Sequence, residues 1–258
     1  MVERIFADRH ANLGSFGSGI NAVVVGATGG IGSAFVEALM RFENVSRVLA
    51  LSRSDPGLDT NRATWVPIDI EDEDSIQAVA EDIRSLVGEL HLVVVASGVL
   101  HHGETLQPEK TWRYISAESL ERAFRINTVG PALLAKHLLP LLARNRKSAF
   151  AALSARVGSI SDNRLGGWHS YRASKAALNM LLKTLSIELT RVNPHALCIG
   201  LHPGTVDSGL SKPFQANVPK GKLFSPQLAA SHLLTVIDGL TPEQSGKVFA
   251  WDGIEIPS

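Results

Sequence analysis

Short apolar runs alternate with longer amphipathic stretches along most of the chain. The short runs, rich in Val, Ile, Leu and Ala, predict buried strands at 21–25, 47–51, 64–68, 90–96, 148–153, 195–201 and 247–251. The longer stretches predict helices at 31–42, 73–87, 117–143, 171–191 and 226–239. Alternating strands and helices indicate right-handed crossovers. We therefore expect one α/β domain, a doubly wound parallel sheet of about seven strands with helices on both faces.

Three segments depart from this regular alternation. Pro131 falls inside the 117–143 pattern, where it is expected to kink or split the helix. Residues 202–225 are rich in Pro and Gly and too long for an ordinary connection, which predicts a substrate lid. Residues 1–20 are mixed in character, and we expect a flexible N-terminal arm before a domain at 21–258.

A glycine motif follows the first predicted strand. Gly26-Ala-Thr-Gly-Gly-Ile-Gly32 lies between the strand Asn21–Val25 and a predicted helix. Glycines there permit a tight turn, and the helix N-terminus attracts phosphate. No Gly-Lys-Ser/Thr follows, which argues against a P-loop. The motif favours a dinucleotide site, although a glycine-rich turn can also occur in an α/β protein that binds no nucleotide.

Tyr171 and Lys175 are four residues apart in a predicted helix, so they lie on the same face. A nearby ammonium favours the phenolate and lowers the pKa of a tyrosine. The pair is therefore a candidate proton donor to a carbonyl. Such a pair also occurs on solvated helix faces, and the upstream glycine motif is what favours the catalytic interpretation.

The amino-acid composition and net charge limit the kinds of binding partner that this chain is expected to have. The chain has 258 residues, a formal net charge of zero and no basic surplus, so neither nucleic acid nor an anionic membrane is an expected partner. It has one cysteine, Cys198, and no apolar stretch of about 18 residues or signal-peptide pattern. These features favour a cytoplasmic location. The nine histidines show no metal-ligand spacing, and His101-His102 lacks companion ligands, so no metal site is expected.

With these motifs in their observed order, residues 21–258 resemble the short-chain dehydrogenase/reductase family. The resemblance implies a Rossmann-type fold, a nicotinamide dinucleotide cofactor, a small carbonyl or alcohol substrate, and a homo-oligomer, either dimer or tetramer. Within the family, Gly158–Asn163, Tyr171–Asn179 and Trp251–Pro257 resemble the C-factor/Sniffer-like carbonyl reductases.

The resemblance also implies roles for single residues. Tyr171 and Lys175 match the catalytic pair, Asn127 would position a water for proton relay, and Ser154 would orient the carbonyl oxygen. The residues expected to bind the cofactor are Gly26, Thr28, Gly29, Gly30, Ile31, Gly32, Ser52, Arg53, Asp69, Ile70, Ala96, Ser97, Gly98, Tyr171, Lys175, Pro203, Gly204, Val206 and Ser208.

Three positions depart from the family pattern. The usual catalytic serine position holds Ala155, so Ser154 serves only if the strand has ended or its register slips. The usual Asn-Ala-Gly after the fourth strand is Ala96-Ser97-Gly98, and Val25 replaces a threonine.

The end of the second strand bears on cofactor choice. An NAD site normally places a carboxylate here, whereas this chain has Ser52 followed by Arg53, whose fork of donors suits a phosphate. We therefore expect NADP(H) to be preferred over NAD(H). Arg53 as a solvated turn residue is the alternative, and the nearby Asp55 weakens the argument.

The resulting hypothesis is an NADP(H)-dependent reduction of an aldehyde or ketone to an alcohol, with Tyr171 as general acid/base. One alternative is a weakly active or non-catalytic dinucleotide-binding signalling protein of C-factor type. Another is a sugar-nucleotide epimerase, which normally needs a larger C-terminal domain. The substrate site is expected between 156–170, the lid and the turn after Gly98, with a wall chosen from Leu165, Trp168, His169, Leu210 and Phe214.

Overall fold

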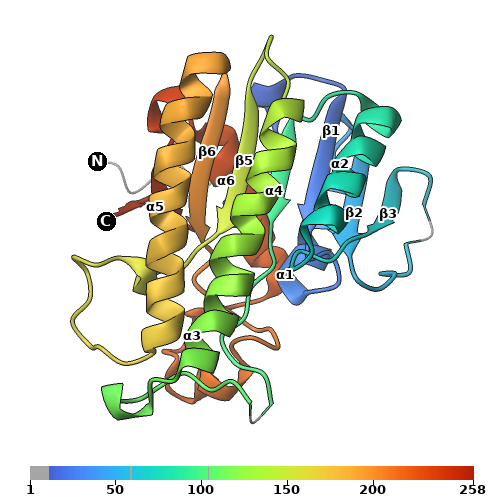
Figure 1. Ribbon diagram of the computed structural model, residues 1–258. Coiled ribbons are helices and arrows are strands. Elements are labelled where there is room, and N and C mark those ends of the chain that lie inside the picture. Colours follow the sequence, from blue (N-terminus) through green and yellow to red (C-terminus); the bar gives the residue numbers. More distant parts are fainter. Residues whose placement is uncertain (1–11, 59, 104) are drawn as a thin grey trace.

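The computed structural model describes residues 12–58, 60–103 and 105–258, which fold around an eight-stranded sheet (Figure 1). The strand order is β10-β9-β6-β5-β4-β1-β2-β3. The strands are β1 (Ile20–Val25), β2 (Val45–Ser52), β3 (Ala63–Pro67), β4 (Leu92–Val95), β5 (Ser148–Leu153), β6 (Ala196–His202), β9 (Val248–Ala250) and β10 (Glu255–Ile256). Neighbours pair in parallel except β9 and β10. All seven expected strands are confirmed; β10 is an additional edge strand, too short to leave a sequence pattern.

Helices cover both faces of the sheet, as expected (Figure 1). On one face, α1 (Gly30–Arg41) and α6 (Pro226–Gly239) pack over one apolar cluster. On the other, α2 (Glu73–Val87), α4 (Gly130–Leu138) and α5 (His169–Val192) pack over a second cluster. The strands are buried on both faces, which explains their continuous apolar character.

The predicted helix 117–143 is divided. It consists of α3 (Ala117–Phe124), a π-helical turn at Arg125–Val129, and α4. Pro131 has no N–H to donate to the carbonyl of Asn127 four residues earlier, so the ordinary α-helical bonding is interrupted. The Gly130 N–H instead donates to the Arg125 carbonyl, one residue further back than in an α-helix. The expected break at Pro131 is therefore confirmed.

The expectation of a flexible arm at 1–20 is corrected for its second half. Residues 1–11 lie outside the described residues, but 12–20 are packed onto the domain. Leu13 and Phe16 are buried in the cluster beneath α6, and Gly14–Phe16 forms a short 3₁₀ turn. Residues 12–20 are therefore not a free arm: two apolar side chains are buried, and Asn44 Nδ2 donates to the carbonyl oxygens of Leu13 and Gly17.

Segment 202–225, predicted to be a substrate lid, has secondary structure of its own. A two-stranded parallel ladder joins β7 (Thr205–Val206) to β8 (Leu223–Phe224), and a 3₁₀ helix spans Lys212–Asn217 between them. The lid is also joined to the loop after β4, because His101 Nε2 lies 3.0 Å from the Gly209 carbonyl oxygen and donates to it.

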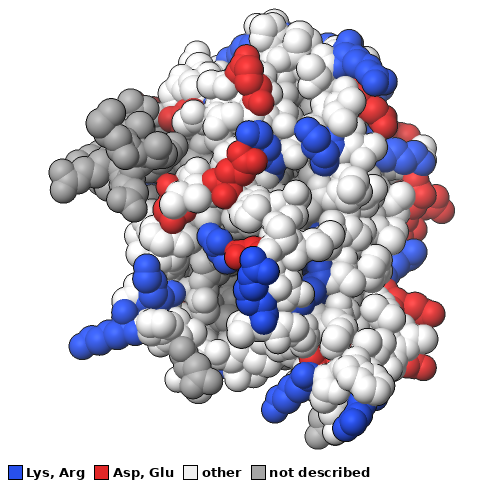
Figure 2. All heavy atoms as spheres, turned by 90° about the vertical axis from the view of Figure 1, so that its left-hand side faces the viewer, with Lys and Arg blue, Asp and Glu red and all other residues white. Residues whose placement is uncertain are grey.

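Charges are interspersed on the face shown in Figure 2, where Lys and Arg alternate with Asp and Glu and form no continuous basic surface. Among the described residues, no helix combines the length and apolar character needed to cross a bilayer.

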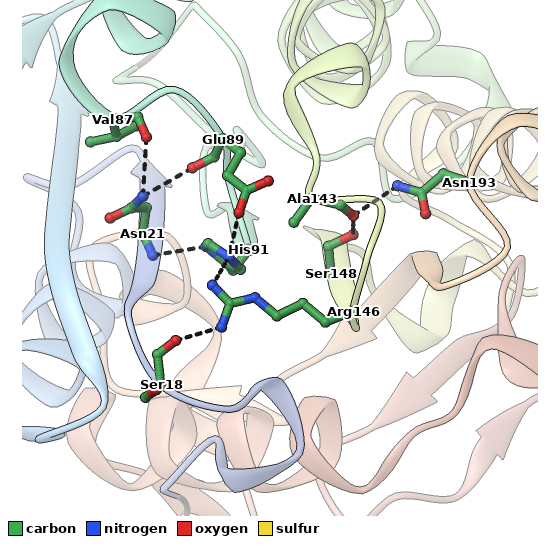
Figure 3. A network of polar contacts seen from close by, with 9 residues as sticks. All are labelled: Ser18, Asn21, Val87, Glu89, His91, Ala143, Arg146, Ser148 and Asn193. Atoms are coloured by element: carbon green, nitrogen blue, oxygen red, sulfur yellow. Dashed lines mark hydrogen bonds and ion pairs between the residues drawn. The ribbon is translucent and has the colours of Figure 1, made fainter.

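A buried polar network ties the amino ends of β1, β4 and β5 together (Figure 3). Nδ1 of the buried His91 accepts from the Asn21 N–H at 3.1 Å, while Nε2 faces Arg146 and Glu89. Burial, reinforced by Arg146, lowers the pKa of His91, so the ring is neutral and can accept. The network therefore lies at the amino ends of the strands, on the opposite side of the sheet from their carboxyl ends.

Candidate functional site

Two adjoining cavities open at the carboxyl ends of the strands, beside the β1–β4 pair where the strand order reverses. Their volumes are about 500 and 710 Å³. They share Thr28, Gly29, Ala96–Gly98, Leu100, Gly209 and Leu210 along their linings, so they form one continuous groove. We call the smaller part the β2–β3 cavity and the larger part the α5 cavity.

The glycine loop forms the floor where the two cavities meet. Gly26 has φ 84°, and a Cβ there would lie 3.0 Å from the Ser97 nitrogen. A Cβ at Gly32 would lie 2.0 Å from the Gly26 carbonyl oxygen, so Gly32 permits close packing although it lines neither cavity. Gly29 is the N-cap of α1, so the amino end of that helix faces the groove. This cradle of backbone donors fits a pyrophosphate.

The predicted adenosine-end residues line the β2–β3 cavity. These are Ser52, Arg53, Asp69 and Ile70. The Ser52 hydroxyl donates to the Ser54 carbonyl oxygen at 2.7 Å, which fixes the turn that carries Arg53. Arg122 of α3 also lines this cavity and pairs with Glu71. Arg122 could not be predicted as a site residue, because nothing in the α3 sequence pattern separates it from an arginine on a solvated helix face.

Tyr171 and Lys175 both line the α5 cavity, as predicted. The Lys175 ammonium donates to the Leu153 carbonyl oxygen at 2.8 Å and lies 5.9 Å from the centre of the Tyr171 ring. Gly98 lines both cavities, and its Cα position faces Lys175: a Cβ there would lie 3.6 Å from the Lys175 nitrogen, in ordinary contact. The lid residues Pro203, Gly204, Val206 and Ser208 line the same cavity.

The pKa of Tyr171 was expected to be lowered by the nearby ammonium, and the structure corrects this direction. Burial raises the pKa of Tyr171 to about 12 and lowers the pKa of Lys175 to about 8. Desolvation therefore outweighs the effect of the neighbouring ammonium, whose hydrogen bond is given to Leu153 rather than to the phenol. At neutral pH the phenol is protonated and the amine is charged.

Ser154 and Ala155 lie just after the end of β5 and line the α5 cavity together. The strand has therefore ended, which is the condition that sequence analysis set for Ser154. However, its hydroxyl donates to Asn179 Oδ1 at 2.6 Å. Ala155 packs against Tyr171 and Leu100. Ala155 therefore shares an apolar cluster with Tyr171, while the hydroxyl of Ser154 is held by Asn179.

Asn127 is fully buried and lines neither cavity. Its Oδ1 accepts from the Val99 N–H and its Nδ2 donates to the Val99 carbonyl oxygen, both at 2.8 Å. The same Nδ2 donates to Ser174 Oγ at 3.1 Å. The amide therefore joins the segment after β4 to α5 directly, while any part in a proton relay stays a prediction.

Three of the five residues predicted to form the wall of the substrate site line the α5 cavity. Trp168, Leu210 and Phe214 line the α5 cavity, whereas Leu165 is 92% exposed and His169 does not line it. The Trp168 ring lies 5.1 Å from that of Phe214 and 6.3 Å from that of Tyr171, measured between centroids. Among the described residues, no group of three or more His, Cys, Asp or Glu side chains gathers as a metal site would require.

The residues present fit a nicotinamide dinucleotide. Besides the glycine cradle, Ser97 Oγ is buried at the junction of the two cavities without a hydrogen-bond partner in the described part of the chain. The groove has a phosphate cradle where its two cavities meet and a tyrosine–lysine pair in the α5 cavity. These features define the class of Rossmann-type oxidoreductases that use nicotinamide dinucleotides.

Comparison with known proteins gives the family. Residues 21–219 match the family model of the short chain dehydrogenases, and the chain belongs to this family. The C-signal of Myxococcus xanthus is 37% identical over 139 residues, which are 54% of this chain and 78% of that protein.

Solved structures agree. An NADPH-bound carbonyl reductase from chicken fatty liver has a TM-score of 0.80 and 25% identity, covering 96% of this chain and 98% of that one. The carbonyl reductase Sniffer of D. melanogaster has a TM-score of 0.81 and 22% identity, covering 93% and 100%. The resemblance to C-factor- and Sniffer-like relatives is therefore confirmed.

Proposed function

We propose that this protein reduces an aldehyde or ketone to an alcohol with NADPH, with Tyr171 as the proton donor. The observation that carries the proposal is the buried Tyr171 in the same cavity as Lys175, at the end of a groove that fits the cofactor.

The cofactor would lie along the groove, with its pyrophosphate over the Gly26–Gly32 loop and its nicotinamide end toward the α5 cavity. When bound, it supplies the hydride that reaches the carbonyl carbon. Pro203, Gly204, Val206 and Ser208 would hold the nicotinamide end, and Lys175 would donate to its ribose hydroxyls by exchanging its bond to Leu153.

Tyr171 donates its proton to the substrate oxygen as negative charge develops there. The phenol, whose pKa burial raises to about 12, carries the proton that reduction requires at neutral pH. Lys175, charged below about pH 8, stabilises the phenolate that remains. Asn127 supports this arrangement by fixing α5 against the segment after β4.

The preference for NADP(H) rests on Ser52 and Arg53 at the β2–β3 cavity. A serine does not repel a 2′-phosphate, and an arginine can bind one with two donors. The bound NADPH of the chicken carbonyl reductase is consistent with this choice. We further propose that the enzyme acts in the cytoplasm as a homo-oligomer, which the family membership supports.

The test is NADPH oxidation measured with a panel of aldehydes, ketones and diketones, alongside direct titration of NADPH and NADH binding. Turnover of at least one carbonyl, with tighter binding of NADPH, is the expected result. Failure to bind either dinucleotide would remove the proposal entirely.

A second function is favoured by one observation, the alanine beside the phenol. A dinucleotide-binding signalling protein of C-factor type needs no efficient turnover, and the C-signal relative is consistent with that role. Cofactor binding without turnover of any carbonyl, at high enzyme concentration, would favour this alternative.

A further inference from the structure

Glu109 carries a carboxylate that is almost completely buried, with 4% of its surface exposed. It lies in the segment between β4 and α3, and it belongs to neither cavity lining. Burying a carboxylate is costly unless it receives hydrogen bonds. The partners of Glu109 therefore indicate what this carboxylate does.

Those partners are at the start of α5. Glu109 Oε2 accepts from the Ser170 N–H at 3.2 Å, and Oε1 accepts from the Ser170 hydroxyl. The N-cap of α5, Trp168, makes no side-chain capping bond. Glu109 therefore supplies the cap from 61 positions away in sequence, and its negative charge lies at the positive end of the helix dipole.

The same residue holds a strained turn. Trp168 has φ 52° and ψ 44°, and among the described non-glycine residues only Leu13 shares a positive φ. A bulky side chain in the left-handed region is unfavourable unless its surroundings fix it. The Trp168 N–H donates to the Glu109 carbonyl oxygen at 2.5 Å, and a Cβ at Gly167 would lie 3.4 Å from that oxygen.

The two residues that Glu109 contacts, Ser170 and Trp168, lie beside the part of the α5 cavity that holds Tyr171. Ser170 immediately precedes Tyr171, so the first turn of α5 carries the phenol. Trp168 contacts the rings of Tyr171 and Phe214 and forms part of the cavity wall. Losing the Glu109 carboxylate would let the first turn of α5, which carries the phenol, fray, while the Trp168 N–H keeps its bond to the Glu109 carbonyl oxygen.

We propose that Glu109 is a positioning residue for Tyr171, its carboxylate acting through Ser170 at the start of α5. The inference rests on the proposed reduction for its kinetic consequence, but its structural consequence is independent of activity. A displacement of even 1 Å can cost on the order of 10²-fold in rate, so the effect should appear in kcat.

The experiment compares four variants of the full chain: Glu109→Ala, Glu109→Gln, Ser170→Ala, and Glu109→Ala combined with Ser170→Ala. Glu118→Ala is the matched control, because Glu118 is an exposed carboxylate in the first turn of α3. Each is measured for kcat per bound NADPH, for the Kd of NADPH, and for amide hydrogen exchange over the start of α5.

Glu109→Ala should lower kcat about tenfold or more while the Kd of NADPH stays within about twofold. The double variant should be no slower than Glu109→Ala, because both changes break one interaction. Glu109→Gln, which retains an acceptor, should recover most of the rate. Amides of the first α5 turn should exchange faster in Glu109→Ala and not in Glu118→Ala.

Unchanged exchange at the start of α5 in Glu109→Ala would overturn the inference, and so would equal loss of kcat and NADPH binding. If Glu109→Ala does not fold, Ser170→Ala decides: wild-type kcat and wild-type exchange together would refute the proposal. Absence of turnover in the wild-type protein would refute the proposed function instead, and the exchange result would still judge the role of Glu109.

Discussion

Ser154 donates its hydroxyl hydrogen to Asn179 Oδ1 at 2.6 Å, one helical turn beyond the lysine that donates to Leu153. These two bonds fasten the end of β5 to α5. Tyr171, Lys175 and Asn179 lie on one face of α5 because they are spaced by four residues. The two bonds turn that face toward β5. Ala155, which follows Ser154 and belongs to the same apolar cluster as Tyr171, cannot donate to a substrate oxygen.

Replacing Ala155 by Ser should therefore raise turnover. A hydroxyl beside Tyr171 would donate to the substrate oxygen as charge develops, and a donor of this kind contributes about tenfold or more. The measurement is kcat with the best carbonyl of the panel. The control is Ser154→Ala, which should cost about 1 kcal/mol of stability and retain most of the turnover. Loss of all turnover in Ser154→Ala would mean that Ser154 itself contacts the substrate.

Tyr171→Phe should lower the rate of carbonyl reduction by about 10²–10⁴-fold, because the phenylalanine ring has no proton to give. The ring volume is retained, so the wall formed with Trp168 and Ala155 persists. The Kd of NADPH, measured by titration, should therefore stay within about twofold. A comparable loss of binding and turnover would assign Tyr171 a structural role in the groove.

The sequence predicts those parts of the molecule that depend on local pattern. Seven strands and the helices follow from hydrophobic periodicity, because each element buries one continuous apolar surface. The groove follows from the glycine motif, since neighbouring backbones at Gly26 and Gly32 leave no room for a Cβ.

Contacts between distant segments leave no local pattern. Nothing near Glu109 indicates that its carboxylate caps a helix 61 residues later. The partner of Ser154 depends on how α5 packs on β5, and the pKa of Tyr171 depends on burial by several elements together. The packed segment 12–20 was missed because two apolar residues, Leu13 and Phe16, form no periodic pattern.

The pH dependence of reduction should follow Lys175 rather than Tyr171. The phenol, with a pKa raised to about 12, stays protonated through the neutral range. Lys175, with its pKa lowered to about 8, loses its charge and its ability to stabilise the phenolate as the pH rises. We expect kcat/KM for reduction to be level below about pH 8 and to fall above it. Alcohol oxidation, which needs the phenolate, should rise with pH. A fall that begins only near the ordinary lysine pKa would show that burial does not control Lys175.

Cofactor choice should respond to one carboxylate at the end of β2. Ser52→Asp places a negative charge where a 2′-phosphate would bind, and its oxygens can accept from ribose hydroxyls. The ratio of the Kd values for NADPH and NADH should shift about tenfold or more toward NADH. Arg53→Ala should weaken NADPH alone. If neither variant changes the ratio, the preference for NADP(H) is wrong.

Lys147 joins the N-terminal segment to the end of α6, and its removal should destabilise the fold. Its ammonium donates to the carbonyl oxygens of Ile237, Asp238 and Leu240 at 2.8, 2.9 and 2.6 Å, and to Ser15 Oγ at 2.9 Å. Carbonyls at a helix C-terminus lack intrahelical donors, and a cation there also interacts favourably with the helix dipole.

Lys147→Met keeps the apolar stem but removes every donor, so the free energy of unfolding should fall by about 2–3 kcal/mol. Denaturant unfolding provides the measurement. The matched control is Lys136→Met, which breaks an ion pair with Glu73 in which both side chains are exposed and should change stability by less than about 1 kcal/mol. Equal effects of the two substitutions would show that the Lys147 contacts contribute no more to stability than a surface ion pair.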